Sequence, residues 1–139
     1  MRRLVCAALA LGLMWFRFQS PAAEGRSDTG LFTEAQATRG ERLYEQYCTA
    51  CHGARLQGNP AAPLVGAVFE SRWADGQHTL DDLFYIVRTQ MPYNAPGSLA
   101  KQQYADVVAY VLKMNGYAAG QAELAPSAAA LKKITLQPR

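Results

Sequence analysis

The stretch Cys48-Thr49-Ala50-Cys51-His52 decides the fold of this 139-residue chain. Two cysteines separated by two residues and followed directly by a histidine form the pattern of covalent c-type haem attachment. On a short helical turn, residues three apart lie on one side, so both thiols can reach the two vinyl groups on one edge of a porphyrin. His52 then lies under the iron and binds it through an imidazole nitrogen. The motif therefore predicts one haem c, held covalently by two thioethers from Cys48 and Cys51.

Three other uses of these cysteines fit the sequence less well. A zinc site takes about four ligands, usually as two Cys or His pairs, and only His78 remains outside the motif. A thioredoxin-type redox pair needs strands around it, and none is predicted near Cys48. A disulfide between Cys48 and Cys51 leaves His52 without a role. The third cysteine, Cys6, lies in the N-terminal segment and is predicted to be absent from the mature protein.

The N-terminal residues are predicted to form a secretory signal peptide. A basic start at Arg2 and Arg3 precedes an apolar run over 4–16, and small residues suited to cleavage follow at 20–23. The apolar run is shorter than the roughly 20 residues that cross a bilayer, so an uncleaved anchor is the weaker alternative. We therefore expect a periplasmic protein without a stable membrane span after cleavage.

These features divide the chain into three predicted parts. They are a signal peptide over 1–23, one haem domain over 24–125 and a C-terminal tail over 126–139. A domain of this length buries a modest core, and a large apolar cofactor would supply much of it. The tail is rich in alanine and is predicted to be flexible.

Removal of the signal peptide changes the charge of the chain. The whole sequence has 14 Lys and Arg against 11 Asp and Glu, and three of the arginines lie in the signal peptide. The mature chain then has 11 basic and 11 acidic side chains. It also has no basic stripe with interleaved aromatic residues. We therefore expect no nucleic-acid partner, although the whole sequence has a pI of about 8.9.

Three main helices are predicted in the haem domain, and no long strand. The first follows the capping box Thr33-x-x-Gln36, after which apolar residues recur at helical spacing. The second follows Thr79, with Asp82 three residues on. The third begins within 98–101 and ends at Asn115-Gly116, where glycine provides a left-handed cap. The regions between the second helix and its neighbours are rich in Gly and Pro and are predicted to be loops, over 53–77 and 90–97.

Gly40 lies in the middle of the first predicted helix. A glycine there costs about 1 kcal/mol relative to alanine. This cost is offset if another helix must cross closely, and Tyr110 in the last helix is the expected neighbour. A tolerated surface glycine is the alternative.

Met91 is the predicted sixth ligand, opposite His52. Outside the signal peptide, the other candidates are Met114 and His78. Met114 lies on the apolar face of a predicted helix, where methionine usually fills the core. His78 precedes a helix cap and is typical of a polar loop. Met91 lies in a loop that Pro92 stiffens, which helps to hold a weak thioether ligand. Such an iron has no open coordination site, which suits electron transfer rather than oxygen activation.

These motifs, in this order, resemble class I cytochromes c. They are most similar to the small cytochromes that serve periplasmic quinoprotein alcohol dehydrogenases, and to the haem domains fused to such enzymes. The resemblance covers about residues 33–124. Its motifs are the haem-attachment residues 48–52, Ala62-Pro63-Leu64, Met91-Pro92, residues 95–99 and residues 104–110. It implies an all-α, class I cytochrome c fold, with three main helices and loops wrapped around one covalent haem.

The resemblance also implies roles for two further residues. A loop carbonyl in this family accepts the second N–H of the axial histidine. Here that carbonyl belongs to Pro63 or to Ala62, and the sequence leaves the choice open. Trp73 resembles an aromatic residue whose indole N–H bonds a haem propionate. A half-buried packing tryptophan is the alternative.

The resemblance implies an electron-transfer protein and not an enzyme. It would carry single electrons from a pyrroloquinoline-quinone (PQQ) alcohol dehydrogenase to a further cytochrome or a terminal oxidase, as a monomer. One alternative is a permanently bound cytochrome subunit of a dehydrogenase complex. Another is a small haem peroxidase or gas-binding protein, which requires Met91 to be off the iron.

Docking of a redox partner is predicted to depend little on charge. The segment from Cys48 to Gly97 contains no lysine. Transient redox interfaces are small, and carriers with a lysine ring lose rate steeply as salt increases. We expect instead an apolar contact surface formed by loop residues, namely Ala61, Ala62, Val65, Tyr93 and Ala95.

Overall fold

The computed structural model describes residues 30–139, so the predicted signal peptide lies outside the described part of the chain. Its six helices are α1 (Glu34–Tyr47), α2 (Thr49–His52), α3 (Ala67–Trp73), α4 (Leu80–Gln90), α5 (Lys101–Met114) and α6 (Ala128–Leu131). Strand pairing in residues 30–139 is limited to two isolated bridges, Phe32 with Ala119 and Thr79 with Thr135. The predicted all-α fold is therefore confirmed. None of the helices in this range has the length and hydrophobicity that a membrane crossing requires.

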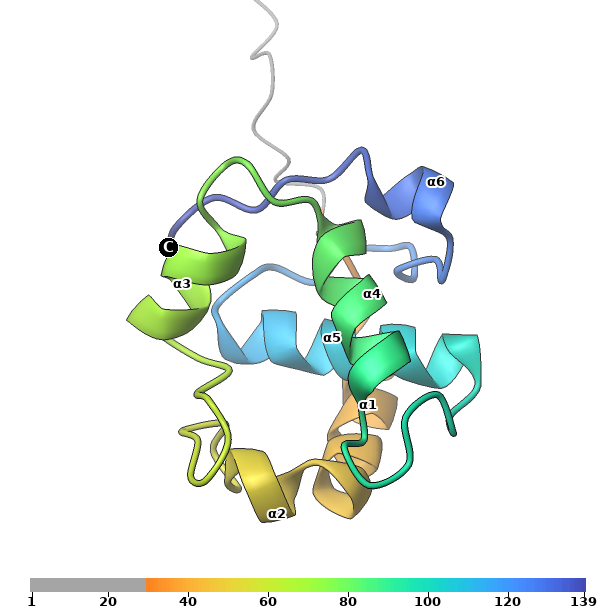
Figure 1. Ribbon diagram of the computed structural model, residues 1–139. Coiled ribbons are helices and arrows are strands. Elements are labelled where there is room, and N and C mark those ends of the chain that lie inside the picture. Colours follow the sequence, from red (N-terminus) through yellow and green to blue (C-terminus); the bar gives the residue numbers. More distant parts are fainter. Residues whose placement is uncertain (1–29) are drawn as a thin grey trace, which may run out of the picture.

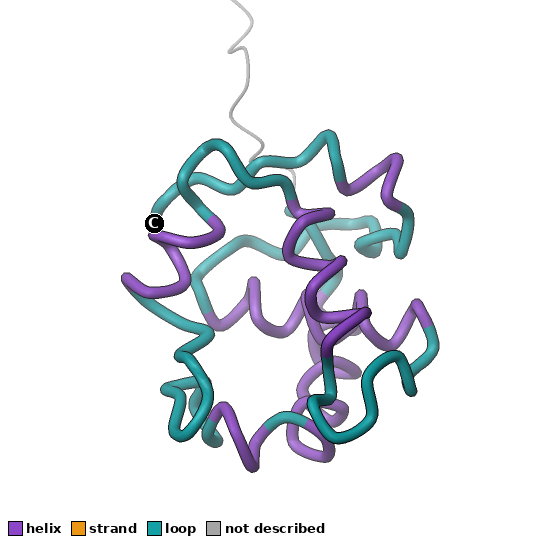
Figure 2. Tube along the Cα trace, in the orientation of Figure 1, coloured by secondary structure: helices purple, strands orange, loops and turns teal. Residues whose placement is uncertain are grey.

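The helices are arranged around the long helix α5. In the view of Figure 1, α5 runs across the middle, and α4 lies in front of it. α1 packs mainly on α5, and α4 also contacts α5. Long loops connect the elements on the side of α2 and α3, as the teal segments of Figure 2 show. The C-terminus lies beside α3 in this view.

α1 begins at the predicted cap, but only half of the predicted capping box forms. The side chain of Thr33 accepts a hydrogen bond from the backbone N–H of Gln36 at 3.1 Å. The Gln36 side chain does not return to Thr33. It is fully buried and exchanges two hydrogen bonds with the backbone of Leu124, at 3.0 and 2.7 Å. A buried amide needs partners for both its donor and its acceptor. The Leu124 backbone supplies both and ties the start of α1 to the chain beyond α5.

Gly40 allows α1 and α5 to cross closely. A Cβ atom at Gly40 would overlap the backbone carbonyl of Asp106 and lie 3.0 Å from the Cβ of Tyr110. The rings of Tyr44 and Tyr110 pack beside this point, with centroids 5.3 Å apart. The predicted close crossing of the two helices is confirmed, and the Asp106 backbone lies nearer to Gly40 than the expected neighbour Tyr110 does.

The predicted second and third helices are also confirmed as α4 and α5. At the start of α4, the backbone N–H of Thr79 donates to the Asp82 carboxylate at 2.7 Å. At the end of α5, Asn115 is the C-cap and Gly116 has a φ of 80°. This is the left-handed conformation that glycine adopts without strain.

One predicted loop contains an additional helix. α3 lies inside the segment 53–77, which was predicted to be irregular. Its side chains Phe69 and Trp73 are buried, whereas Val68 is 48% exposed. The helix has only seven residues, so its apolar period is too short to be read from the sequence.

The prediction of a flexible C-terminal tail is wrong. Leu131 and Leu136 are almost fully buried, with exposed fractions of 0% and 2%. The backbone N–H of Leu80 donates to the carbonyl of Ile134 at 2.8 Å. The Tyr117 hydroxyl donates to a carbonyl further along, that of Gln137, also at 2.8 Å. Two widely spaced leucines therefore anchor the tail to the start of α4, although its composition is that of a loose terminus.

Candidate haem-binding site

The haem-attachment motif forms a single helical turn directly after α1. Cys48 ends α1, with its N–H bonded to Tyr44 at 2.9 Å, and also begins α2. Its carbonyl accepts from the N–H groups of Cys51 at 3.2 Å and His52 at 2.9 Å. This is the predicted turn, which brings both cysteines to one side of the chain. The two cysteines are not joined to each other. Burial, with a contribution from the charge of Cys51, raises the pKa of the Cys48 thiol to about 11.

The imidazole of His52 is held by a direct hydrogen bond. Its Nδ1 lies 2.9 Å from the carbonyl oxygen of Ala62. Because a carbonyl only accepts, Nδ1 must carry the proton, and Nε2 keeps its lone pair for a metal. Of the two carbonyls that the sequence left open, the structure therefore selects Ala62, and the prediction of Pro63 as the acceptor is replaced. Pro63 restricts the backbone of the residue before it, which helps to fix the Ala62 carbonyl.

The loop that carries Ala62, residues 53–66, is called the histidine loop below. Its backbone is hydrogen-bonded to the attachment motif at several points. The N–H of Gly58 donates to the carbonyl of His52 at 2.8 Å, and the N–H of Ala61 donates to the carbonyl of Cys51 at 3.0 Å. The Tyr44 hydroxyl donates to Gly53 at 2.7 Å. The acceptor of the His52 ring is therefore part of a loop with several anchors.

Asn115 anchors the far end of the histidine loop. Its side-chain amide donates to the carbonyl of Leu64 at 2.8 Å and to Val111 at 2.8 Å. Its side-chain oxygen accepts from the N–H of Gly66 at 3.1 Å. The sequence identified Asn115 only as the end of a helix. The sequence alone could not show that this asparagine bonds Leu64, which lies 51 residues earlier in the chain.

Met91 ends α4 and begins a second loop, residues 91–99, called the methionine loop below. Its backbone N–H still bonds to Val87 at 3.2 Å, but its backbone is extended. Its side chain is half-buried, and Pro92 beside it is buried. The rest of the loop faces solvent, and Tyr93 is 84% exposed. The structure thus places the Met91 thioether at a boundary between core and solvent.

The carbonyl of Met91 is held by a residue that sequence reasoning missed. The Tyr104 hydroxyl donates to the Met91 carbonyl at 2.8 Å and accepts from the N–H of Leu99 at 3.2 Å. The N–H of Gly97 also approaches the Met91 carbonyl, at 3.3 Å. Tyr104 is 2% exposed. In the sequence it was one apolar position of a helix, and nothing marked its hydroxyl as a loop contact.

The two rival ligands are placed differently from Met91. Met114 is 41% exposed at the end of α5, so its prediction as core filler is wrong. His78 bonds through Nδ1 to the Asp75 carboxylate at 2.9 Å. It precedes α4, whereas Met91 follows it, so about 16 Å of helix separates them.

Trp73 lies at the end of α3 and is 8% exposed. The ring of His78 packs edge-on against it, with centroids 5.7 Å apart. The Arg72 guanidinium lies 5.0 Å from the ring centroid. Trp73 is therefore a packing residue with two polar neighbours, and its hydrogen bond to a propionate stays a prediction.

The donor set fits a haem c. Two unpaired thiols lie on one turn, and the imidazole that follows them has a free Nε2 and a fixed tautomer. Met91 adds a half-buried thioether on a loop that is bonded to the core. Thioether and imidazole are axial ligands that raise a haem potential.

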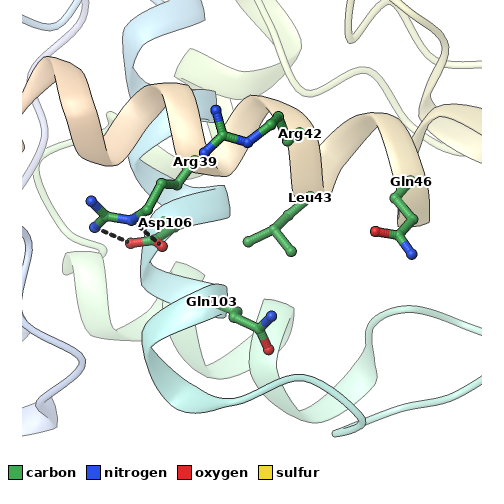
Figure 3. Close-up of a pocket in the computed structure, with 6 residues that line it drawn as sticks. All are labelled: Arg39, Arg42, Leu43, Gln46, Gln103 and Asp106. Atoms are coloured by element: carbon green, nitrogen blue, oxygen red, sulfur yellow. Dashed lines mark hydrogen bonds and ion pairs between the residues drawn. The ribbon is translucent and has the colours of Figure 1, made fainter.

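A surface hollow of about 400 Å³ between α1 and α5 does not belong to this site. Figure 3 shows the residues that line it, Arg39, Arg42, Leu43, Gln46, Gln103 and Asp106. None of them is a predicted haem residue. Within the hollow, Arg39 bonds Asp106 at 2.9 and 3.1 Å and Glu123 at 2.8 Å. These contacts stabilise the crossing of α1 and α5.

Comparisons with known proteins agree with this geometry. The family model described as cytochrome c oxidase, cbb3-type, subunit III matches residues 35–111. Cytochrome c-551 of Bacillus subtilis is 37% identical over 73 residues, covering 51% of this chain and 60% of that protein. The chain thus spans less than two thirds of this curated relative. The crystal structure of the sulfane dehydrogenase SoxCD from Paracoccus pantotrophus matches with a TM-score of 0.54 and 20% identity, over 78% of this chain and 61% of that one. This second likeness concerns the fold alone.

Proposed function

The chain belongs to the cytochrome c family described as cbb3-type cytochrome c oxidase subunit III, and we propose that it is a single-electron carrier with one haem c. The observation that carries the proposal is the attachment turn with the His52 ring fixed on Ala62 at 2.9 Å. When bound, a haem c supplies a one-electron couple at its iron. The residues of the chain hold and orient this group.

Each predicted site residue has a separate task in this proposal. Cys48 and Cys51 would hold the porphyrin edge through thioethers, and His52 would bind the iron through Nε2. Met91 would be the second side-chain ligand of the iron. Trp73 would donate its indole N–H to a propionate. The Ala62 carbonyl keeps the His52 ring in one tautomer, which strengthens it as a ligand.

Two axial side chains favour electron transfer over catalysis at the iron. A ligand such as oxygen or peroxide needs an open coordination position, and Met91 would occupy it. This is the physical reason to prefer a carrier over a small peroxidase or gas-binding protein.

A visible spectrum of the purified holoprotein, oxidised and reduced, tests this proposal. We expect a low-spin c-type spectrum with a thioether–iron charge-transfer band in the oxidised form. Carbon monoxide added to the reduced protein should bind only slowly, because Met91 must leave first. Rapid and complete binding of carbon monoxide would favour the gas-binding alternative.

We propose further that the carrier works in the periplasm, between a PQQ alcohol dehydrogenase and another cytochrome or a terminal oxidase. The predicted signal peptide and the motifs shared with cytochromes of such dehydrogenases support this placement. Its loop residues Ala62, Tyr93 and Ala95 are exposed, and Ala61 and Val65 are half-buried. These residues would form an apolar contact surface for the partner.

The salt dependence of electron transfer tests this contact surface. Stopped-flow rates of reduction by the dehydrogenase, measured over a salt series, should change only weakly. A decrease by orders of magnitude between low and moderate salt would show that charge steers the encounter.

A permanently bound subunit is the second candidate. The description of the matching family, which names an oxidase subunit, favours it. Size-exclusion chromatography of a native periplasmic extract distinguishes the two. A free monomeric carrier would elute near or somewhat below the 15.2 kDa of the whole chain, and a subunit would elute with a larger complex.

A further inference from the structure

The side chain of Tyr104 is buried in the core, but its hydroxyl forms hydrogen bonds with the methionine loop. We propose that Tyr104 is a positioning residue, which keeps the Met91 thioether in place by tying both ends of the methionine loop to α5. The inference rests on the proposed ligation by Met91. It adds a residue that neither the sequence motifs nor the family resemblance assigned to the site.

The contacts of the hydroxyl reach the two ends of the loop. It donates to the carbonyl of Met91, the first residue, at 2.8 Å. It accepts from the N–H of Leu99, the last residue, at 3.2 Å. A phenol has one donor, and here that donor and an acceptor position bond to the same loop. The hydroxyl therefore closes the loop at its base.

The phenol is held on a rigid support. Tyr104 is the fourth residue of α5 and is 2% exposed within the hydrophobic core. α5 packs on both α1 and α4. The hydroxyl therefore has a fixed position, and the loop must adapt to it.

The loop itself offers little other support. Three hydrogen bonds close it internally, from Ala95 to Pro92 at 2.9 Å, from Gly97 to Met91 at 3.3 Å and from Ser98 to Ala95 at 3.3 Å. Residues 93–98 are all exposed. Two of the three internal bonds are long. The Tyr104 hydroxyl provides hydrogen bonds from the loop to α5, beside the buried Pro92 and the packing of Leu99 on the core.

The consequence concerns ligand exchange. A neutral thioether competes at the iron with any added ligand, and the loop must move before Met91 can leave. Loss of the hydroxyl leaves the Leu99 N–H without this partner and removes the shorter bond to the Met91 carbonyl. Loss of about one hydrogen bond should make the displaced state about tenfold more accessible, which corresponds to about 1.4 kcal/mol.

The test compares Tyr104→Phe with Tyr117→Phe in the oxidised holoprotein. Tyr117 provides a matched control because it is also buried, at 6%, and also donates to a backbone carbonyl at 2.8 Å, in the C-terminal tail. Imidazole is the probe, and loss of the thioether–iron band reports its binding. We expect Tyr104→Phe to bind imidazole about tenfold more tightly than the unmodified protein. We expect Tyr117→Phe to bind it unchanged, with a similar decrease in the urea midpoint for both variants.

An equal imidazole affinity in Tyr104→Phe and the unmodified protein would overturn the inference, as would an equal increase in both variants. If the unmodified protein has no thioether–iron band, the proposed ligation by Met91 itself fails. The two failures are therefore distinguishable.

A second measurement needs no variant and covers the case that Tyr104→Phe does not fold. Hydrogen exchange of the Leu99 amide should be slow in the unmodified holoprotein and become faster when imidazole displaces Met91. A Leu99 amide whose exchange is unaffected by imidazole would also overturn the inference.

Discussion

The histidine loop and the methionine loop each adjoin a proposed iron ligand, but the two loops are held in different ways. His52 follows an attachment cysteine directly, and its ring bonds a carbonyl of the histidine loop at 2.9 Å. That loop is in turn bonded to Cys51, to His52 and to Asn115. Met91 has no attachment beside it, and the hydrogen bonds from its loop to α5 are those of the Tyr104 hydroxyl.

The difference indicates that the histidine side, meaning the attachment turn and the histidine loop, is held more firmly than the methionine side, meaning Met91 and its loop. The histidine side is fixed both through the attachment turn and through several hydrogen bonds, so its ligand should stay bound when the protein is perturbed. The methionine loop has fewer hydrogen bonds to the rest of the protein, and its residues 93–98 are exposed. Local opening of a protein begins where contacts are few and the backbone is exposed. We therefore expect the methionine side to open first.

The largest expected effect comes from removing the covalent attachment. The double variant Cys48→Ala, Cys51→Ala should give little folded protein, because a small domain lacks the centre of its core without porphyrin. Haem staining of a denaturing gel and protease resistance of the exported protein measure this. A well-folded, protease-resistant protein without haem would contradict the view that the attachment side organises the fold.

The next largest effect is expected from removing Met91, the proposed second ligand. Met91→Ala should abolish the thioether–iron band, lower the reduction potential and increase imidazole affinity more than Tyr104→Phe does, because thioether ligation favours ferrous iron. Met114→Leu is the matched control, and it should change none of these since Met114 is 41% exposed at the end of α5. Loss of the band in Met114→Leu but not in Met91→Ala would reverse the assignment.

A smaller effect is expected from Asn115→Ala on the histidine side. The variant removes the side-chain bonds to Leu64 and Gly66, and it should lower the free energy of unfolding by about 1–3 kcal/mol. Urea unfolding measures this cost. Imidazole affinity should stay unchanged, because the histidine loop does not hold Met91. A tenfold increase in imidazole affinity would show that the two sides are not independent.

The smallest effect concerns Asp75, which lies outside both loops. Hydrogen bonds from the backbone N–H groups of His78 and Gln77 lower its pKa from 3.8 to about 2. Because the pKa is lower in the folded state, the charged carboxylate stabilises the fold above about pH 4, and this contribution is lost as the pH falls towards 2. Asp75→Asn should therefore reduce the urea midpoint slightly at pH 7 and by less at pH 2. A difference between the two proteins that is as large at pH 2 as at pH 7 would contradict this account.

The parts of the fold that follow from local signals could be predicted from the sequence. Each of these signals depends on residues close together in the chain. They are the attachment turn, the caps at Thr33 and Thr79, and the end of α5 at Asn115. A close helix crossing at Gly40 was one of two possibilities, because a glycine in the middle of a helix is destabilising unless another helix needs the space. These signals predicted a helical domain, and the resemblance to class I cytochromes c implied the cytochrome c fold.

The parts that could not be predicted depend on contacts between distant residues. The Gln36 side chain does not form the expected capping-box bond to Thr33 and bonds instead to the backbone of Leu124, 88 residues away. The tail packs on the domain because Leu131 and Leu136 are buried and the Ile134 carbonyl accepts from the N–H of Leu80. The sequence also could not show that the His52 ring bonds Ala62 rather than Pro63, or that the Tyr104 hydroxyl bonds the methionine loop. Both depend on the three-dimensional positions of the loops.

The axial ligand opposite His52 is the central claim, and one NMR measurement tests it most directly. In the reduced holoprotein, a methyl group held over the porphyrin should give a methionine signal shifted strongly upfield by the ring current. We predict one such signal, absent from Met91→Ala and present in Met114→Leu. A spectrum without this signal, or one in which Met114→Leu removes it and Met91→Ala does not, would contradict the assignment of Met91 and the comparison between the two loops.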